Sequence, residues 1–348
     1  MTITDTTPKR TAPAAGRATD PLTVAAGQAP HSPSAADGSV PESTAAGIRE
    51  LRDRAALQTA LAAERRAGRS IGLVPTMGAL HAGHLALIEA ARRECDTVLI
   101  SIFVNPAQFG PDEDFEAYPR DQARDLELAA GAGASLAYLP SAEQVYPSGF
   151  ATRVEVDGLT EVLCGAPGSR GAAHFRGVTT VVCKLLNAIG PDRAYFGGKD
   201  AQQVAVIRRM VTDLEIPVEI RTVATVREAD GLAMSSRNGY LSPAERERAA
   251  ELPRALNTAR EAVLTGHPLD EAIALARETL ADADIEPEYF EARDPDDLTP
   301  ASDPLEGPVL LALAAPVGRT RLIDNLVIDP LDYPAAKEAA EDEQRSTA

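Results

Sequence analysis

Apolar residues recur along the chain in two alternating patterns, which predict strands and helices in turn. Short runs of aliphatic residues, typical of strands buried in a parallel sheet, lie at residues 71–74, 97–104, 136–139, 194–196 and 218–223. Helical spacing lies before and between them, at residues 47–68, 83–94, 121–130, 178–189 and 201–214. In the first of these helices, Ile48, Leu51, Leu57 and Leu61 share roughly one face.

Strands that alternate with helices predict an α/β fold, a Rossmann-like doubly wound parallel sheet with helices on both faces. In such sheets ligands bind beyond the carboxyl ends of the strands. After residue 225 the order changes. Two helices are predicted at residues 243–265 and 269–281, and three strands at 288–293, 309–314 and 320–328. Helices followed by consecutive strands predict a smaller C-terminal α+β domain with an antiparallel sheet.

Four segments are therefore expected. Residues 1–46 are rich in Ala, Pro, Thr, Ser and Gly without apolar periodicity, which predicts a disordered N-terminal tail. It could be functional or a dispensable extension. A Rossmann-like domain is expected at residues 47–224 and a C-terminal α+β lid domain at 225–332. An acidic tail follows at residues 333–348.

Charge and cysteine content narrow the class of protein. The formal net charge is −18, which argues against a nucleic-acid partner and requires a local positive pocket for any anionic ligand. No two of the three cysteines have C-x-x-C spacing, so neither a disulfide framework nor a zinc knuckle is indicated. No apolar run is long enough for a membrane span, and no secretory signal is visible. A cytoplasmic location without membrane partners is expected.

The strongest chemical signal is the segment V-P-T-M-G-A-L-H-A-G-H at residues 74–84, between the first strand and its helix. Gly78 and Gly83 permit close approach of a ligand to the backbone. The helix N-terminus offers free N–H groups that suit a phosphate. His81 and His84 can both donate hydrogen bonds to that phosphate. An H-x-G-H at such a turn is typical of nucleotidyl transfer, and two unrelated surface or capping histidines are the alternative.

Other polar residues follow further strands at the same expected edge of the sheet. Asn105 and Gln108 come just after residues 97–104, and their amides can bind hydroxyl and carboxylate oxygens. Lys199 follows two glycines as a compact positive charge. Asp200 would either cap the next helix or contact the ligand. Two serines and an arginine at residues 235–237, where the second domain begins, suit an oligophosphate and could close over a nucleotide.

Together these segments resemble the pantothenate synthetase (pantoate–β-alanine ligase) family of the H-x-G-H nucleotidyltransferase-like superfamily. The matching blocks occur in order from about residue 47 to residue 328. They also include Glu113-Asp114, Tyr118-Pro119-Arg120, His174-Phe175-Arg176-Gly177-Val178-Thr179-Thr180-Val181-Val182 and Arg321-Leu322-Ile323-Asp324-Asn325. Two positions depart from the family pattern. Gly198 stands where Glu or Gln is usual, and residues 170–173 form a loop without Pro that is one residue longer.

The resemblance implies residue roles. The ATP site comprises Met77, Gly78, Ala79, Leu80, His81, Ala82, Gly83, His84, Gly197, Gly198, Lys199, Asp200, Val226, Met234, Ser235, Ser236 and Arg237. His84 (the implied proton donor), His81 and Lys199 are the catalytic residues. Gln108 and Gln203 hold pantoate, and Gln108 also lies near β-alanine. Mg²⁺ accompanies the triphosphate, with Asp125 as a metal-side carboxylate. The family also implies a homodimer.

The implied reaction is the ATP-dependent condensation of (R)-pantoate with β-alanine to pantothenate. It releases AMP and pyrophosphate through a pantoyl-adenylate intermediate, so the protein is expected to be an AMP-forming acid–amino-acid ligase. Its partners are the small molecules pantoate, β-alanine and ATP. Two alternatives stay open: a nucleotidyltransferase of the same superfamily, or a non-catalytic nucleotide-binding relative.

Overall fold

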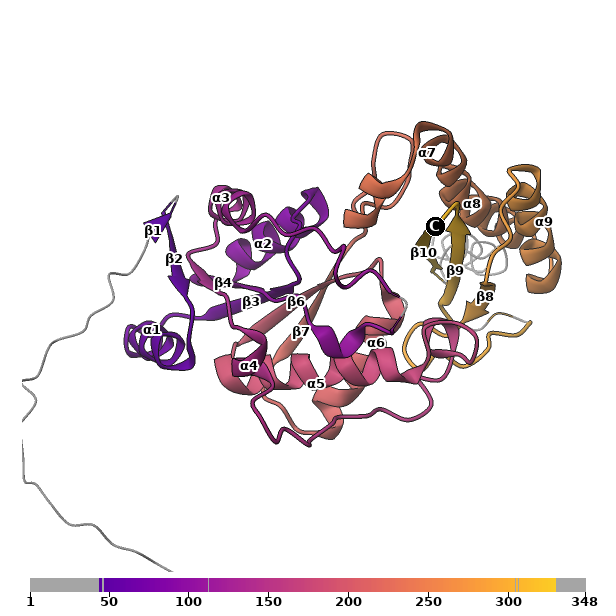
Figure 1. Cartoon of the computed structure of the whole chain (residues 1–348). Helices are drawn as coiled ribbons and strands as arrows, with labels where there is room; N and C mark the ends of the chain where they lie inside the picture. Colours follow the sequence, from indigo (N-terminus) through magenta and orange to yellow (C-terminus); the bar gives the residue numbers. More distant parts are fainter. Residues whose placement is uncertain (1–43, 46, 112, 304, 306, 330–348) are drawn as a thin grey trace, which may run out of the picture. The chain divides into compact units, whose positions relative to one another are not determined.

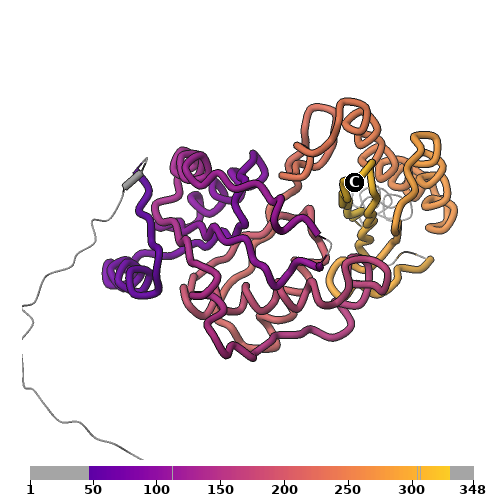
Figure 2. Tube along the Cα trace, in the orientation of Figure 1, coloured from indigo at the N-terminus to yellow at the C-terminus, as the bar shows by residue number. Residues whose placement is uncertain are grey.

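The computed structural model describes residues 44–45, 47–111, 113–303, 305 and 307–329 of the chain. Figure 2 follows their path from indigo to yellow. The disordered tail expected at residues 1–46 lies outside the described residues, apart from the two residues 44–45. The acidic tail expected at residues 333–348 lies wholly outside them.

The first half of the described chain forms a sheet with the strand order β1-β2-β5-β4-β3-β6-β7 (Figure 1). Its strands are β1 (Thr44–Ala45), β2 (Ile48–Leu51), β3 (Ile71–Thr76), β4 (Thr97–Ile102), β5 (Leu136–Tyr138), β6 (Arg193–Gly197) and β7 (Glu219–Val223). β1 pairs with β2 in the antiparallel sense, and every other neighbouring pair is parallel. The predicted α/β fold with a parallel sheet is confirmed.

Helices cover both faces of this sheet (Figure 1). They are α1 (Arg54–Arg66), α2 (Ala82–Glu94), α3 (Gln122–Ala132), α4 (Ala142–Val145), α5 (Ala172–Ile189) and α6 (Ala201–Asp213). Successive side chains of a strand enter opposite cores. Leu73 of β3 packs in the core that contains residues of α1, α5 and α6, whereas Val74 packs in the core that contains residues of α2 and α3. Burial on both faces explains the nearly continuous apolar runs of the sequence.

The order of the strands reverses beside β3. From β3 the chain moves outward through β4 and β5, and it then returns to place β6 on the other side of β3, followed by β7. The backbones of β3 and β6 pair directly, through Gly72 with Arg193 and Leu73 with Ala194. The loops that follow these two strands therefore diverge at a topological switch point, where ligands of open α/β sheets bind.

The second half of the described chain forms helices followed by a separate antiparallel sheet, as predicted. Its elements are α7 (Pro243–Ala249), α8 (Glu251–Leu264), α9 (Leu269–Asp282), β8 (Tyr289–Arg293), β9 (Val309–Val317) and β10 (Thr320–Ile328). The strands are antiparallel in the order β10-β9-β8. They share one core with α8 and α9, to which Leu256, Leu280 and Leu313 contribute. Among the described residues, no helix has both the length and the apolar character of a membrane span.

Two predicted helix boundaries are wrong at their N-terminal ends. Residues 48–51 form the strand β2 and not the start of a helix. The helix α1 begins only after Asp53, whose side chain caps it by accepting a hydrogen bond from the Ala56 N–H. The helix expected from residue 178 begins at Ala172, after Gly171 with a positive φ of 79°.

The helix predicted at residues 243–265 is divided into α7 and α8 at Ala250. Pro253 explains the division. It has no N–H for the carbonyl of Ala249, four residues earlier, and its ring would clash with that carbonyl in a continuous helix. Pro253 is instead tolerated within the first turn of α8.

Candidate active site

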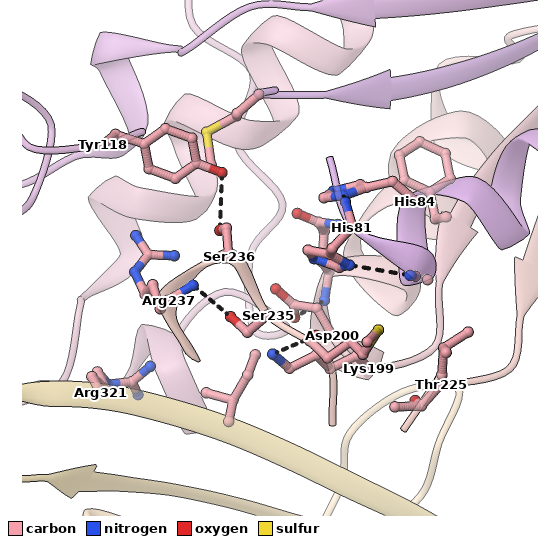
Figure 3. Close-up of a pocket in the computed structure, with 18 of the residues that line it drawn as sticks. His81, His84, Tyr118, Lys199, Asp200, Thr225, Ser235, Ser236, Arg237 and Arg321 are labelled. Carbon is pink, nitrogen blue, oxygen red and sulfur yellow. Dashed lines mark hydrogen bonds between the residues drawn. The ribbon is translucent and has the colours of Figure 1, made fainter. Parts of the chain in front are cut away.

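A cavity of about 520 Å³ lies at the carboxyl ends of β3 and β6, where residues of β10 complete its wall (Figure 3). Most of the residues expected to form the site line it: Met77, His81, Gly83, His84, Gln108, Gly197, Lys199, Asp200, Gln203, Val226, Met234, Ser235, Ser236 and Arg237. Gly78, Ala79, Leu80, Ala82 and Gly198 lie in the same loops but are not part of the lining. One cavity thus brings together residues from four separate segments of the sequence.

His81 and His84 form a reciprocal cap at the start of α2. The Nδ1 atom of His81 accepts a hydrogen bond of 3.1 Å from the Gly83 N–H, and Nδ1 of His84 accepts one of 3.3 Å from the His81 N–H. Their ring centroids are 4.1 Å apart. Because both Nδ1 atoms accept, the proton of each neutral ring is on Nε2. The two histidines therefore cap the helix and also offer Nε2–H donors at the cavity.

Both imidazoles are uncharged at neutral pH in the free protein. Burial lowers the pKa of His81 to about 4, and the nearby Lys199 charge adds to the effect. Burial likewise lowers the pKa of His84 to about 3, assisted by His81 and Lys199. Both imidazoles therefore enter the site as neutral hydrogen-bond donors.

The turn before His81 has a strained backbone that Asp125 holds. Gly78 and Ala79 both have positive φ values, 85° and 52°. The buried carboxylate of Asp125 accepts hydrogen bonds from the Ala79 and Leu80 N–H groups, at 2.9 and 2.7 Å. A Cβ atom at position 78 would lie 2.8 Å from Asp125 Oδ2, so only glycine fits there. These contacts give Asp125 a structural role at the turn, and the metal-side role expected from the sequence stays a prediction.

Lys199 and Asp200 follow β6 directly. The Lys199 Nζ atom donates a hydrogen bond of 3.2 Å to the Met234 carbonyl. Burial lowers the pKa of Lys199 to about 8, against the opposing effects of Asp324 and Asp200. Asp200 is the N-cap of α6, since its carboxylate accepts a hydrogen bond of 3.0 Å from the Gln203 N–H. Of the two roles open from sequence, Asp200 performs the capping role and also lines the cavity.

The segment at residues 235–237 begins the 3-10 helix η3 (Ser236–Tyr240). The Ser235 hydroxyl caps it by accepting from the Arg237 N–H at 3.3 Å. The Arg237 guanidinium forms an ion pair with Asp114 at 2.8 Å, and the hydroxyls of Ser236 and Tyr118 are 3.3 Å apart. These contacts join η3 to the segment between β4 and α3 across the cavity.

Gln108 ends another short 3-10 helix, η1 (Pro106–Gln108), just beyond β4. The Asn105 side chain donates a hydrogen bond of 3.0 Å to Oε1 of Gln108, which fixes the orientation of its amide. The Gln108 carbonyl accepts a hydrogen bond of 2.8 Å from Nδ1 of His174. Nε2 of this histidine then accepts from Arg170 at 3.2 Å, and Arg170 is paired with Glu113. The altered loop thus contributes Arg170 to a network behind Gln108.

Several lining residues were not assigned from the sequence: Glu113, Asp114, Tyr118, Arg170, His174, Tyr240, Arg319 and Arg321. Arg321 was part of a matching block, yet nothing in its spacing showed that β10 borders the cavity. Its guanidinium contacts Glu288, Ser169 and the Cys164 thiol. Only the folded arrangement, in which β10 lies beside the loop after β6, reveals this position.

The chemistry of the lining suits a large anion beside a smaller polar ligand. Lys199, Arg237 and the imidazole Nε2–H groups provide positive charge and donors around one part of the cavity, at the N-terminus of α2. Gln108 and Gln203 offer neutral amides for hydroxyl and carboxylate oxygens. Within the described residues, no group of three or more His, Cys, Asp or Glu side chains could hold a metal ion.

Comparisons with known proteins identify the family. The family model described as pantoate–β-alanine ligase matches residues 49–327. The pantothenate synthetase of Moorella thermoacetica is 55% identical over 282 residues, which are 80% of this chain and 98% of the relative. The pantothenate synthetase 1 of Bradyrhizobium diazoefficiens is also 55% identical, over 79% of this chain and 96% of the relative.

Solved structures show the same fold. The chain is similar to the Thermus thermophilus pantoate–β-alanine ligase (pantothenate synthetase), with a TM-score of 0.76 and 47% identity over 82% of this chain and 99% of that one. It is also similar to the Francisella tularensis pantoate–β-alanine ligase, a complex with β-γ ATP and β-alanine. There the TM-score is 0.67 and the identity 31%, over 80% of this chain and 97% of that one.

Proposed function

The chain belongs to the pantoate–β-alanine ligase family, and on this premise we propose that it condenses (R)-pantoate with β-alanine to pantothenate. The reaction consumes ATP, releases AMP and pyrophosphate, and proceeds through pantoyl adenylate. One observation carries the proposal at the level of the site: paired imidazole donors, Lys199 and Arg237 line a single cavity at the switch point of the sheet. These groups are suited to the phosphates of ATP.

The first half-reaction activates a carboxylate, which is otherwise a poor acyl donor. A carboxylate oxygen of pantoate attacks the α-phosphorus of ATP, and the bond to pyrophosphate breaks. Negative charge spreads over the transferring and leaving oxygens, where fixed donors lower the barrier. We assign this role to the Nε2–H groups of His81 and His84, to the Lys199 ammonium and to Arg237.

We assign pantoate to the amides of Gln108 and Gln203, with the β-alanine amine near Gln108. In the second half-reaction this amine attacks the carbonyl carbon of the adenylate, and AMP leaves with the bridging oxygen. Both steps exchange groups between bound substrates, so no covalent enzyme intermediate is required. The contribution of the protein is to position reactants and stabilise charge.

Magnesium is expected to accompany the triphosphate. Three carboxylates line the cavity: Glu113 is paired with Arg170, and Asp200 caps α6. The third, Asp114, is paired with Arg237 through Oδ1, but its buried Oδ2 atom has no hydrogen-bond partner within the described part of the chain. One carboxylate together with phosphate oxygens and water suits Mg²⁺. We therefore propose that Asp114 assists the phosphates in holding the ion, which neutralises phosphate charge when bound.

An omission assay tests the proposed function. Pyrophosphate is expected only when ATP, Mg²⁺ and pantoate are all present, and free AMP and pantothenate should form in multiple turnovers only when β-alanine is added. Labelled carboxylate oxygen of pantoate should appear in AMP. A nucleotidyltransferase would ignore β-alanine and give a dinucleotide-type product, and a non-catalytic relative would give no pyrophosphate. Either result would overturn the proposal.

The activity is expected to decline as the pH rises through about 8. Lys199 has a pKa lowered to about 8, so its ammonium is present below that pH and is lost above it. The free enzyme then loses positive charge that the phosphates require, so kcat/KM for ATP should fall on the alkaline side. The pH profile of kcat/KM measures this directly. A profile that stays flat well above pH 8 would contradict the assignment of Lys199 to the phosphates.

We further propose a homodimer in the cytoplasm, as the family resemblance implies. Light scattering after gel filtration should give twice the chain mass of 36.6 kDa. A monomer mass at the concentration of the activity assay would exclude the dimer as the active form.

A further inference from the structure

The position of the Lys199 ammonium depends on a short loop between the end of β6 and the N-cap of α6. Two successive carbonyls of this loop, those of Gly198 and Lys199, accept hydrogen bonds from a single atom, the side-chain Nδ2 of Asn325. The distances are 2.9 and 2.7 Å. Asn325 belongs to β10, in the other sheet, and is not among the residues that line the cavity.

Two hydrogen bonds from one amide constrain the loop more than a single bond would. A carboxamide NH₂ group has two protons, and here each has its own carbonyl. Fixing two adjacent carbonyls restricts rotation of the peptide planes around Lys199. The loop is held from its other side by the Gly198 N–H, which donates to the Val223 carbonyl at 2.8 Å. The backbone from which the lysine extends is therefore held on both sides.

Asn325 is itself fixed by its neighbour Asp324. The buried Asp324 carboxylate forms two hydrogen bonds with the Arg227 guanidinium, at 2.7 and 3.0 Å, and accepts another from the Asn325 N–H. Arg227 also donates to the Asn325 and Gly231 carbonyls. Such a charged, bidentate pair has a defined geometry.

Together these contacts hold both the backbone and the side chain of Lys199. Arg227 lies on the segment that leads to Met234, and the Met234 carbonyl accepts the hydrogen bond of the Lys199 ammonium. Asn325 thus holds the backbone of Lys199, while the segment anchored by Arg227 holds the end of its side chain. The Asp324 carboxylate also opposes the effect of burial on the pKa of Lys199. The two hydrogen bonds of Asn325 join the loop after β6, in the first sheet, to β10 of the second.

We propose that Asn325 is a positioning residue through which the C-terminal sheet places Lys199 at the phosphates. The phosphate site is then complete only when the two sheets are in contact through this residue. The inference rests on the proposed function for its catalytic consequence, but the contact itself does not. Asn325 needs no contact with a substrate and acts through the lysine.

Two substitutions remove the amide donors in different ways. Asn325→Asp keeps the shape of the side chain, and Asn325→Leu avoids a new charge. Both are expected to lower the rate of pantoate-dependent pyrophosphate release on the order of 10- to 100-fold, as displaced catalytic groups do. Asn257→Leu is the matched control, since that exposed side chain donates only to a carbonyl of its own helix. It should have the parental rate.

A double-mutant cycle with Lys199→Ala separates positioning from a general structural effect. If Asn325 acts through Lys199, Asn325→Leu should change the rate little in the Lys199→Ala background. Multiplicative effects would overturn the inference, and so would a parental rate for Asn325→Leu. Parental circular dichroism is expected for both variants at a somewhat lower melting temperature, because the Gly198 and Lys199 carbonyls lose their donor. A fold lost in both variants would mean that Asn325 is structural.

The same cycle can be measured by titration with the non-hydrolysable analogue β,γ-imido ATP. This binding readout does not depend on the proposed reaction. A parent protein without pantoate-dependent pyrophosphate release would refute the proposed function alone. Additive losses of nucleotide affinity for Asn325→Leu and Lys199→Ala would refute the positioning role alone.

Discussion

Replacement of Lys199 by alanine is expected to lower the rate of pyrophosphate release in the first half-reaction by about 10²–10³-fold, the usual effect of removing one positioned donor. The ammonium is held within the cavity by the Met234 carbonyl, close enough to both imidazoles to lower their pKa values. No other lysine lines the cavity in the described residues. The measurement is single-turnover pyrophosphate release with saturating pantoate.

Lys184→Ala is the matched control for this change. Lys184 lies on α5, and its ammonium is 4.6 Å from the centroid of the Phe150 ring. It is not among the residues that line the cavity. The control should keep the parental rate, and both variants should keep the parental circular dichroism. A Lys199→Ala enzyme with near-parental AMP production would show that the phosphates are stabilised elsewhere.

His84→Asn should cause a loss of similar size, about 10²–10³-fold, in the same half-reaction. The asparagine Oδ1 atom can take the place of Nδ1 and accept from the His81 N–H, so the cap of α2 is retained. The Nε2–H donor is lost. This substitution therefore removes the proposed catalytic atom and leaves the structural one.

A second substitution and a distant control complete the test. His84→Gln offers an N–H near the position of Nε2, and its Oε1 atom can accept from the His81 N–H as that of Gln144 does from the Ser141 N–H at the start of α4. It should therefore retain more activity than His84→Asn at a similar melting temperature. His267→Asn changes an exposed histidine after α8 and should have no effect on the rate. Equal activities of the Asn and Gln variants would indicate that His84 only caps the helix.

Much of the fold could be predicted because a strand that is buried on both faces of a sheet has a nearly continuous apolar sequence. Residues 98–100 are wholly aliphatic for this reason, and the alternation with helical spacing indicated a parallel sheet. Periodicity could not supply the strand order, which depends on long-range packing. The glycines after β3 and β6 nevertheless marked the two loops that meet at the switch point.

Predictions from apolar spacing failed where a single side chain determines the start of a helix. Asp53 and Pro253 decided where α1 and α8 begin, against the apolar spacing of the surrounding residues. In the site, His81 and His84 belong to a recognisable motif, whereas the residues that hold the loops in place do not. Asp125 and Asn325 act through contacts with backbone atoms far away in sequence, and no spacing rule reports such contacts.

The imidazoles at the start of α2 have a consequence for how this enzyme can evolve. Serine, threonine, aspartate or asparagine would be better N-cap residues than histidine, so a firmer helix is one substitution away at position 81. The same substitution would remove an Nε2–H from the triphosphate. Selection for heat resistance and selection for turnover therefore act on the His81 ring in opposite directions, and thermal adaptation that keeps this donor has to come from other positions.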